Sequence, residues 1–206
     1  MGIDLTSSAA KPSACLGLDN KLQVVYFGFL SRDTDILAMA SSHLPEVIAI
    51  DAPLSLSAST KKGRACERQL AALGIPCYFT TEKSIIKKMV YRGIELKSKL
   101  AARGFRVIEV YPYASKICLF GKAMPRKTTP QGISFLKEHL RTLLPSLKPY
   151  LGMFDHNLCD AAIAAYTASI YCRNMVDALG NNEEGLIFIP SARSCNQTGV
   201  GLRAFL

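Results

Sequence analysis

The sequence lacks tryptophan, any Cys-x-x-Cys pair, and any apolar run of the roughly 18 residues that a membrane-spanning helix needs. The last absence argues against a membrane protein. The seven cysteines are odd in number and show no zinc-site spacing, which argues against a disulfide framework and a structural zinc site. We therefore expect reduced thiols and a cytoplasmic protein. The first expected strand begins at Gly2, which leaves no room for a signal peptide.

Length and charge set the next limits. The chain has 206 residues, of which 49% are hydrophobic, and this suits one compact domain with a sizeable core. We expect a single domain over residues 1–206, in which about 190–206 form a loosely ordered tail. The formal net charge of +9 favours a polyanionic partner, most commonly nucleic acid, although charge that serves only solubility is the alternative. Tyrosine and phenylalanine are scattered, so the sequence indicates no stacking platform for a single strand.

Three apolar segments each carry one acidic residue near a turn signal. The clearest is 47–53, where Val-Ile-Ala-Ile is typical of a strand buried on both faces, followed by Asp51 and Pro53. Asp4 lies in the first expected strand and Glu109 in a late one. A carboxylate at the end of a buried strand is unfavourable unless something neutralises it. The three acids therefore indicate one shared site.

The order of elements predicts the fold. Apolar runs at 11–18 and 22–30, separated by an Asp-Asn turn, indicate a hairpin, so the chain opens as a three-stranded meander. Helices are expected over 33–44, 64–73, 82–103, 135–144 and 158–179, with a turn at 113–121, a loop at 124–132 and a short edge strand at 187–189. Right-handed crossovers make the second and third acid-bearing strands parallel to the first. The predicted fold is α/β, with three layers and a mixed five-stranded sheet of a meander and two parallel strands, flanked by helices.

This topology would bring Asp4, Asp51 and Glu109 to the sheet edge where open α/β folds bind ligands. A fourth acid, Asp160, opens an alanine-rich helix, where a capping role is the alternative. Clustered carboxylates raise one another's pKa unless a cation lies between them. Oxygen ligands of this kind suit Mg²⁺ or Mn²⁺. Four acids could hold two such ions about 3.5–4 Å apart, the arrangement that serves phosphoryl displacement.

Five motifs extend this pattern over most of the chain. They are Gly-Ile-Asp at 2–4, Asp-Ala-Pro-Leu at 51–54, Arg-Ala-Cys-Glu-Arg at 64–68, Val-Ile-Glu-Val-Tyr-Pro at 107–112 and Asp-Ala-Ala-Ile-Ala-Ala at 160–165. Together they resemble the DUF429 family, described as predicted nucleases of the ribonuclease H-like fold. The resemblance implies two-metal hydrolysis of a phosphodiester in DNA or RNA. Asp4, Asp51 and Asp160 match the metal-binding carboxylates of such nucleases, and Glu109 matches the acid of the family's Glu-Val-Tyr-Pro motif.

Basic side chains near these motifs are candidates for binding substrate. Arg64 and Arg68 lie at i and i+4, so one helical turn could clamp a phosphate, with Glu67 orienting an arginine or adding a ligand. A surface ion-pair cluster is the alternative. Lys116 and Lys127 are weaker candidates for backbone phosphates.

Other interpretations stay open at this stage. The segment 2–7 is similar to the first phosphate loop of actin-like ATPases, but the second glycine loop and the duplicated domain of those phosphotransferases are missing. A non-catalytic module that binds nucleic acid through a basic stripe on 82–103 is a third function, and a solvated helix face is the simpler explanation of that stripe. His156 could act as a general acid or base, although a capping or core histidine explains it as well. The oligomeric state is not indicated.

Overall fold

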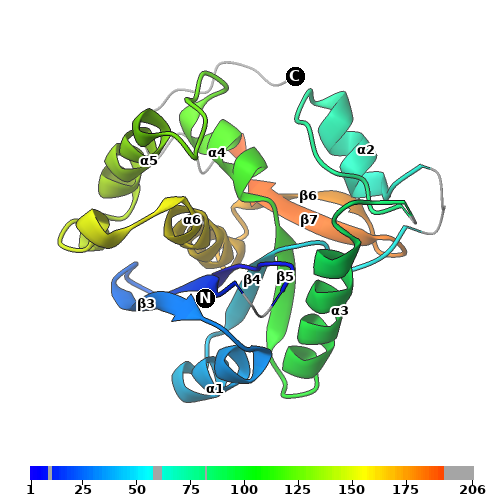
Figure 1. The fold of residues 1–206 in the computed structure, drawn as a ribbon, viewed down its shortest axis with the longest axis horizontal. Helices are drawn as coiled ribbons and strands as arrows, with labels where there is room; N and C mark the ends of the chain where they lie inside the picture. Colours follow the sequence, from blue (N-terminus) through cyan, green and yellow to red (C-terminus); the bar gives the residue numbers. More distant parts are fainter. Residues whose placement is uncertain (9–10, 58–61, 82, 193–206) are drawn as a thin grey trace.

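Seven strands form one mixed sheet in the computed structural model of the protein, which describes residues 1–8, 11–57, 62–81 and 83–192 (Figure 1). The order across the sheet is β3-β2-β1-β4-β5-β7-β6. The strands are β1 (Gly2–Asp4), β2 (Ser13–Leu18), β3 (Val24–Leu30), β4 (Val47–Asp51), β5 (Arg106–Val110), β6 (Val176–Asn181) and β7 (Gly185–Pro190). Strands β1, β4, β5 and β7 run parallel to one another, and the outer strands are antiparallel to their neighbours.

Helices cover both faces of this sheet, as Figure 1 shows. They are α1 (Asp33–His43), α2 (Ala65–Ala72), α3 (Lys87–Ala101), α4 (Pro112–Phe120), α5 (Pro130–Leu143) and α6 (His156–Tyr171), with single turns of 3₁₀ helix at Pro145–Leu147 and Leu151–Met153. Apolar residues of α1 and α3 pack on one face of β1 and β4. On the opposite face α6 packs against β1, β2 and β4, and α5 lies outside it. None of the helices in the described ranges is long and apolar enough to span a membrane.

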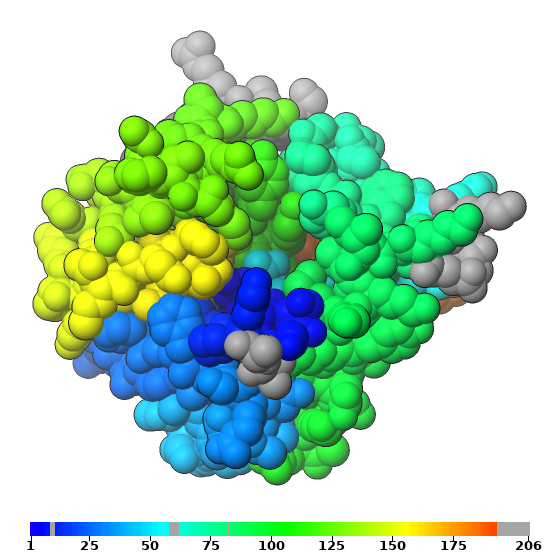
Figure 2. Space-filling model, viewed as in Figure 1, coloured from blue at the N-terminus to red at the C-terminus, as the bar shows by residue number. Residues whose placement is uncertain are grey.

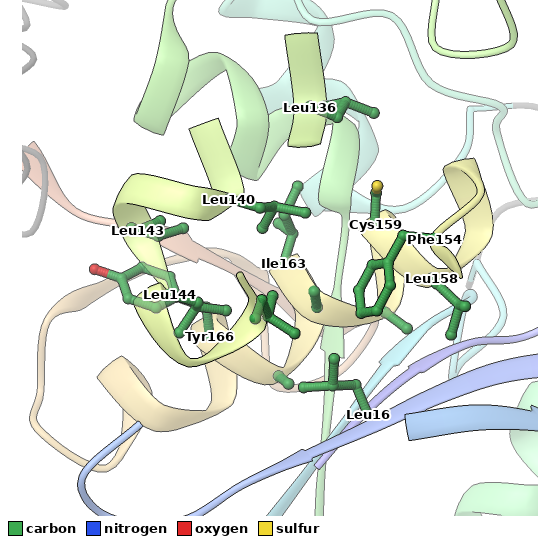
Figure 3. Close-up of a cluster of buried hydrophobic side chains, with 14 of the residues drawn as sticks. Leu16, Leu136, Leu140, Leu143, Leu144, Phe154, Leu158, Cys159, Ile163 and Tyr166 are labelled. Atoms are coloured by element: carbon green, nitrogen blue, oxygen red, sulfur yellow. The ribbon is translucent and has the colours of Figure 1, made fainter. Parts of the chain in front are cut away.

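The small residues of α6 allow it to lie unusually close to the sheet. Leucines of α5, Leu16 of β2 and Ile163 of α6 form the largest buried cluster (Figure 3). At Gly2 the approach is so close that a Cβ atom would lie 2.1 Å from the backbone nitrogen of Ala165 and 2.3 Å from the carbonyl oxygen of Ala161. The first strand and α6 therefore meet backbone to backbone, which places the start of α6 beside the end of β1.

The opening meander and the parallel strands β4 and β5 confirm the sequence-based predictions. The five-stranded sheet was too small, because a hairpin of β6 and β7 extends it to seven strands. Helix α6 ends at Tyr171 instead of 179, since Asn174 takes a left-handed conformation (φ 54°) and the chain then turns into β6. The alanine- and leucine-containing composition continues past the helix end, so composition alone did not mark the break.

Two further expectations need correction or lie outside the structure. The segment 113–121, assigned as a turn, belongs to α4, whose first helical residue is Pro112, a position that suits proline because its missing N–H is not needed there. Of the expected tail at about 190–206, residues 193–206 lie outside the described part of the chain, and β7 runs to Pro190.

Candidate functional site

Two of the predicted acids are direct neighbours across a pair of parallel strands. Asp4 ends β1, Asp51 ends β4, and the two residues are register partners. Partners in neighbouring strands project to the same face of a sheet. That face is the one covered by α6, because Gly2 and Ala49, two residues earlier in each strand, contact it. The predicted convergence of these two carboxylates follows from the strand pairing.

Helix α6 brings a third acid to the same place, together with two lysines. Asp160 is buried, and its Oδ1 accepts a hydrogen bond of 2.7 Å from Nζ of Lys116, which is also buried. Its Oδ2 is bonded by Nζ of Lys127 from the loop before α5. The cap of α6 is Asp155, whose side chain accepts from two backbone N–H groups, so Asp160 lies one turn further along and has no capping role.

The carboxylates of Asp4, Asp51 and Asp160 and the ammonium groups of Lys116 and Lys127 form one electrostatic cluster, in which neighbouring charges shift the pKa of each acid. Burial and the charge of Asp160 raise the pKa of Asp4 to about 7. Burial and the charges of Asp4 and Asp160 raise the pKa of Asp51 well above its ordinary value. Burial alone would raise the pKa of Asp160 as well, but Lys116 and Lys127 together lower it. Asp160 is therefore neutralised internally, whereas neither Asp4 nor Asp51 has an ion-pair partner within the described ranges, so ionising either acid is unfavourable.

This imbalance predicts a pH-dependent stability of the protein in a chelator. Unfolded aspartate loses its proton near pH 3.8, whereas folded Asp4 keeps it up to about pH 7. Between these values the folded state binds more protons, so its stability falls as the pH rises. We expect Asp4→Asn, which mimics the protonated acid, to match the wild type near pH 4 and to exceed it at pH 8 by on the order of 4 kcal/mol. Urea unfolding across this range measures the difference; an Asp4→Asn curve parallel to the wild type would contradict it.

Glu109 points to the other face of the sheet. Its register partner in β4 is Ile50, not Asp51, and a shift of one residue along a strand reverses the direction of the side chain. There its carboxylate receives two hydrogen bonds from Arg64, at 2.8 and 2.6 Å, and one of 2.7 Å from the backbone nitrogen of Leu54. The structure thus brings together Asp4, Asp51 and Asp160 on the α6 face of the sheet. Glu109 lies on the opposite face, paired with Arg64.

Arg64 forms the centre of a buried network and has little access to a phosphate. It is 1% exposed, and its Nε donates to Glu67 at 2.9 Å while Nη1 also reaches the Ser55 hydroxyl at 2.8 Å. Glu67 in turn accepts from the backbone nitrogens of Arg64 and Thr80. This network holds the loop that follows Asp51 and the first turn of α2.

The remaining predicted residues lie at the edges of these two clusters. Arg68 is half-exposed, donates to the carbonyl oxygen of Gly63 and forms an ion pair of 3.4 Å with Glu184. Lys127 is similarly exposed, with its amino group on Asp160. His156 is the first residue of α6, one helical turn before Asp160, and its buried Nδ1 has no hydrogen-bond partner among the described residues. Of these, Arg68 and Lys127 have the exposure that contact with a polyanion requires.

Some of the side chains beside the site belong to none of the sequence motifs. An apolar pocket next to Asp51 contains Tyr78 and Met89, which lie outside the five motifs, and Tyr111, which lies inside one. Residues from three separate segments meet there, so only their position after folding reveals the pocket. The helical period of the expected helix 82–103 predicts Met89 on its apolar face, and Met89 packs against the core there, but nothing local marks Tyr78.

Fold and site together define an α/β protein with a carboxylate–lysine centre at the carboxyl ends of its parallel strands. All residues of that centre lie within a segment that matches a known protein family. The family described as "Protein of unknown function (DUF429)" matches residues 2–184, and the chain belongs to it. No curated protein matches the chain significantly.

Proposed function

We propose that the protein is a divalent-metal-dependent phosphodiesterase of the ribonuclease H-like fold that hydrolyses nucleic acid. The observation that carries this proposal is the in-register pair of Asp4 and Asp51, with Asp160 on the same face of the sheet. The order β3-β2-β1-β4-β5 of the first five strands supports the fold assignment. The formal net charge of +9, despite an acidic centre, supports a polyanionic substrate.

The donor set fits Mg²⁺ or Mn²⁺. Such ions keep several waters and take one or two carboxylates from the protein, and Asp4 and Asp51 satisfy that requirement. Burial and mutual repulsion raise the pKa of both acids, so a divalent cation would stabilise their ionised forms. Within the described ranges no group of three or more His, Cys, Asp or Glu side chains is arranged to hold a metal. A second ion, as two-metal hydrolysis requires, would use Asp160 after Lys127 has moved away from it.

A bound metal would activate water and stabilise charge on the scissile phosphate. The protein's own side chains would do the rest. Asp4 and Asp51 fix the position of the cation on two rigid strands. Lys116 holds Asp160 in place from the buried side, and the more exposed Lys127 can pass from Asp160 to a phosphate oxygen of the substrate. Glu109 and Arg64 support this centre through the loop at Leu54.

Calorimetric titration with Mn²⁺, together with cleavage assays on a panel of labelled DNA and RNA, tests the proposal. We expect Asp51→Asn to lower Mn²⁺ affinity by at least about 100-fold, because loss of a ligand exceeds the 10–100-fold effect of a supporting residue. Metal-dependent cleavage should disappear in parallel. Asp177→Asn, on exposed β6, is the matched control and should behave as wild type.

The other outcomes separate the alternatives. If the protein binds Mn²⁺ but cleaves no substrate, the metal site is supported and the nuclease activity is contradicted. An absence of Mn²⁺ binding, with nucleic-acid binding intact in Asp51→Asn, would contradict the proposal and leave a binding module whose acids are structural.

A further inference from the structure

An apolar pocket meets the carboxylate centre at Asp51, beside Glu109 and Arg64. Its cavity volume is about 80 Å³, and the cavity is partly open to solvent. Its walls come from the loop after β4, from α2 and the segment that follows it, from α3, and from β5 and β7. The apolar residues among them are Ala52, Pro53, Leu70, Cys77, Tyr78, Ile86, Met89, Val110, Tyr111 and Ile187. Figure 2 shows the hollow near the middle of this face, between the blue N-terminal segment, green α4 and the teal-to-green surface of α2 and α3.

Aromatic side chains mark the opening of this pocket. Tyr78 is 63% exposed. Tyr111 lies deeper, with its hydroxyl bonded to the carbonyl oxygen of Pro76 at 2.8 Å and its ring centroid 6.0 Å from that of Tyr113, which is also exposed. Asp51 and Tyr111 both line the pocket, and burial and the Asp51 carboxylate raise the pKa of Tyr111. Exposed aromatic rings beside a polar centre are typical of a binding surface.

The polar side chains in the pocket wall are already engaged. Arg64, Glu67 and Glu109 line it, but they bond to one another and to backbone nitrogens. A ligand group in the pocket would therefore meet apolar and aromatic surface rather than free hydrogen-bonding groups. Asp51 is the exception, and it stands on the side toward the proposed metal site. The ligand must combine an apolar, stackable group with a group that a metal centre binds.

We propose that this pocket holds a nucleobase of the nucleic-acid substrate, unstacked from its neighbours, while the adjoining phosphate lies at Asp4 and Asp51. The inference rests on the proposed function and adds a substrate class to it. A nucleotide is the unit that carries a flat, stackable ring within a few bonds of a phosphate. Stacking on tyrosine tolerates any base, so the pocket favours single-stranded or locally unpaired nucleic acid without strong sequence preference. In a duplex the base would first have to leave the stack, which lowers affinity.

Binding can be measured without the metal. In a chelator, fluorescence anisotropy compares a labelled single-stranded DNA oligonucleotide of mixed sequence with an abasic oligonucleotide of equal length and with the same sequence as a duplex. We expect the wild type to bind the base-containing single strand about 10-fold more tightly than either of the others. Tyr78→Ala should lose most of that advantage and keep its affinity for the abasic strand. Tyr78→Phe, which preserves the ring, should behave as wild type.

Tyr150→Ala provides the matched control, because Tyr150 is also exposed but packs on Phe27 away from the pocket. Equal affinity of the wild type for base-containing and abasic strands, or an unchanged preference in Tyr78→Ala, overturns the proposal. If adenosine monophosphate displaces the oligonucleotide at equal concentration of bases, the pocket takes free nucleotides and the nucleic-acid substrate is overturned. The binding assay contains no metal, so it tests the pocket separately from the metal site. If the protein prefers the base-containing strand but does not bind Mn²⁺, the base pocket is supported and only the nuclease proposal is contradicted. If the protein cleaves nucleic acid with metal but does not prefer the base-containing strand, the nuclease is supported and the base pocket is contradicted.

Discussion

Arg64→Met lowers the free energy of unfolding by about 3–5 kcal/mol, the range observed when one member of a buried ion pair is removed. The reason lies in what remains. Glu109 and Glu67 are buried, and both lose their charged partner at 2.6–2.9 Å. Burial raises the pKa of Glu109, and the bonds from Arg64 act against that rise. Without the guanidinium, Glu109 must either hold an uncompensated charge or take up a proton. Chemical denaturation of the purified variant measures the loss.

Two further variants separate the buried network from a general effect of losing an arginine. Arg68→Met removes a neighbouring arginine on the same helix that is 46% exposed and whose ion pair with Glu184 spans 3.4 Å. We expect less than about 1 kcal/mol there. Arg64→Met combined with Glu109→Gln should recover at least about 1 kcal/mol of the loss, because the neutral amide no longer needs a cation. Equal effects of Arg64→Met and Arg68→Met would contradict a role for the buried network.

Gly2→Ala destabilises the protein by about 3 kcal/mol, at the upper end of the usual effect of overpacking. The added methyl group would lie 2.1 Å from one backbone atom of α6 and 2.3 Å from another. Backbone atoms of a helix cannot rotate away as a side chain can, so β1 and α6 must separate. Because Asp4 lies on β1 and Asp160 on α6, their separation also changes the carboxylate cluster. Thermal unfolding and Mn²⁺ calorimetry on the same sample measure both consequences.

Gly152→Ala is the control for that substitution. Apart from its two chain neighbours, no residue that the structure describes has an atom within 4 Å of the position of its added Cβ, and we expect a change within about 0.5 kcal/mol. If Gly2→Ala is as stable as Gly152→Ala, α6 can shift at no cost and the close approach does not hold the site together. If stability falls but any Mn²⁺ affinity of the wild type is unchanged, the contact supports the fold without positioning the acids.

Some of the structural features behind these predictions could be read from the sequence, and others could not. The acids at the ends of β1 and β4 could be predicted, because a charged residue after a run of buried β-branched residues marks the end of an internal strand. Their parallel arrangement followed from the handedness of crossovers. The meander could be predicted as well, since two apolar-rich runs flank a polar Asp-Asn turn, although the connection in the structure is longer and spans residues 19–23. These are local signals, and each depends on only a few neighbouring residues.

The side of the sheet on which Glu109 lies depends on strand register, and register is a property of two strands. Had Glu109 paired with Asp51, all the strand acids would share one face; pairing with Ile50 sends it to the other, where Arg64 neutralises it. A shift of one residue decides between a place in the cluster of Asp4 and Asp51 and a buried ion pair with Arg64. The motif that contains Glu109 is the same in both cases.

The sequence by itself determined that acids end buried strands, that the chain is α/β, and that its overall charge is basic. Only the tertiary structure decided which acids meet, because their neighbours come from distant segments: Lys116 from α4, Lys127 from a loop, and Asp160 from α6. The pairing of β6 with β7, which makes the expected edge strand at 187–189 an internal one, and the pocket at Tyr78 were decided in the same way. Long-range packing brings these groups together and determines their burial, and burial decides whether a charged side chain is neutralised in the core or available at a site.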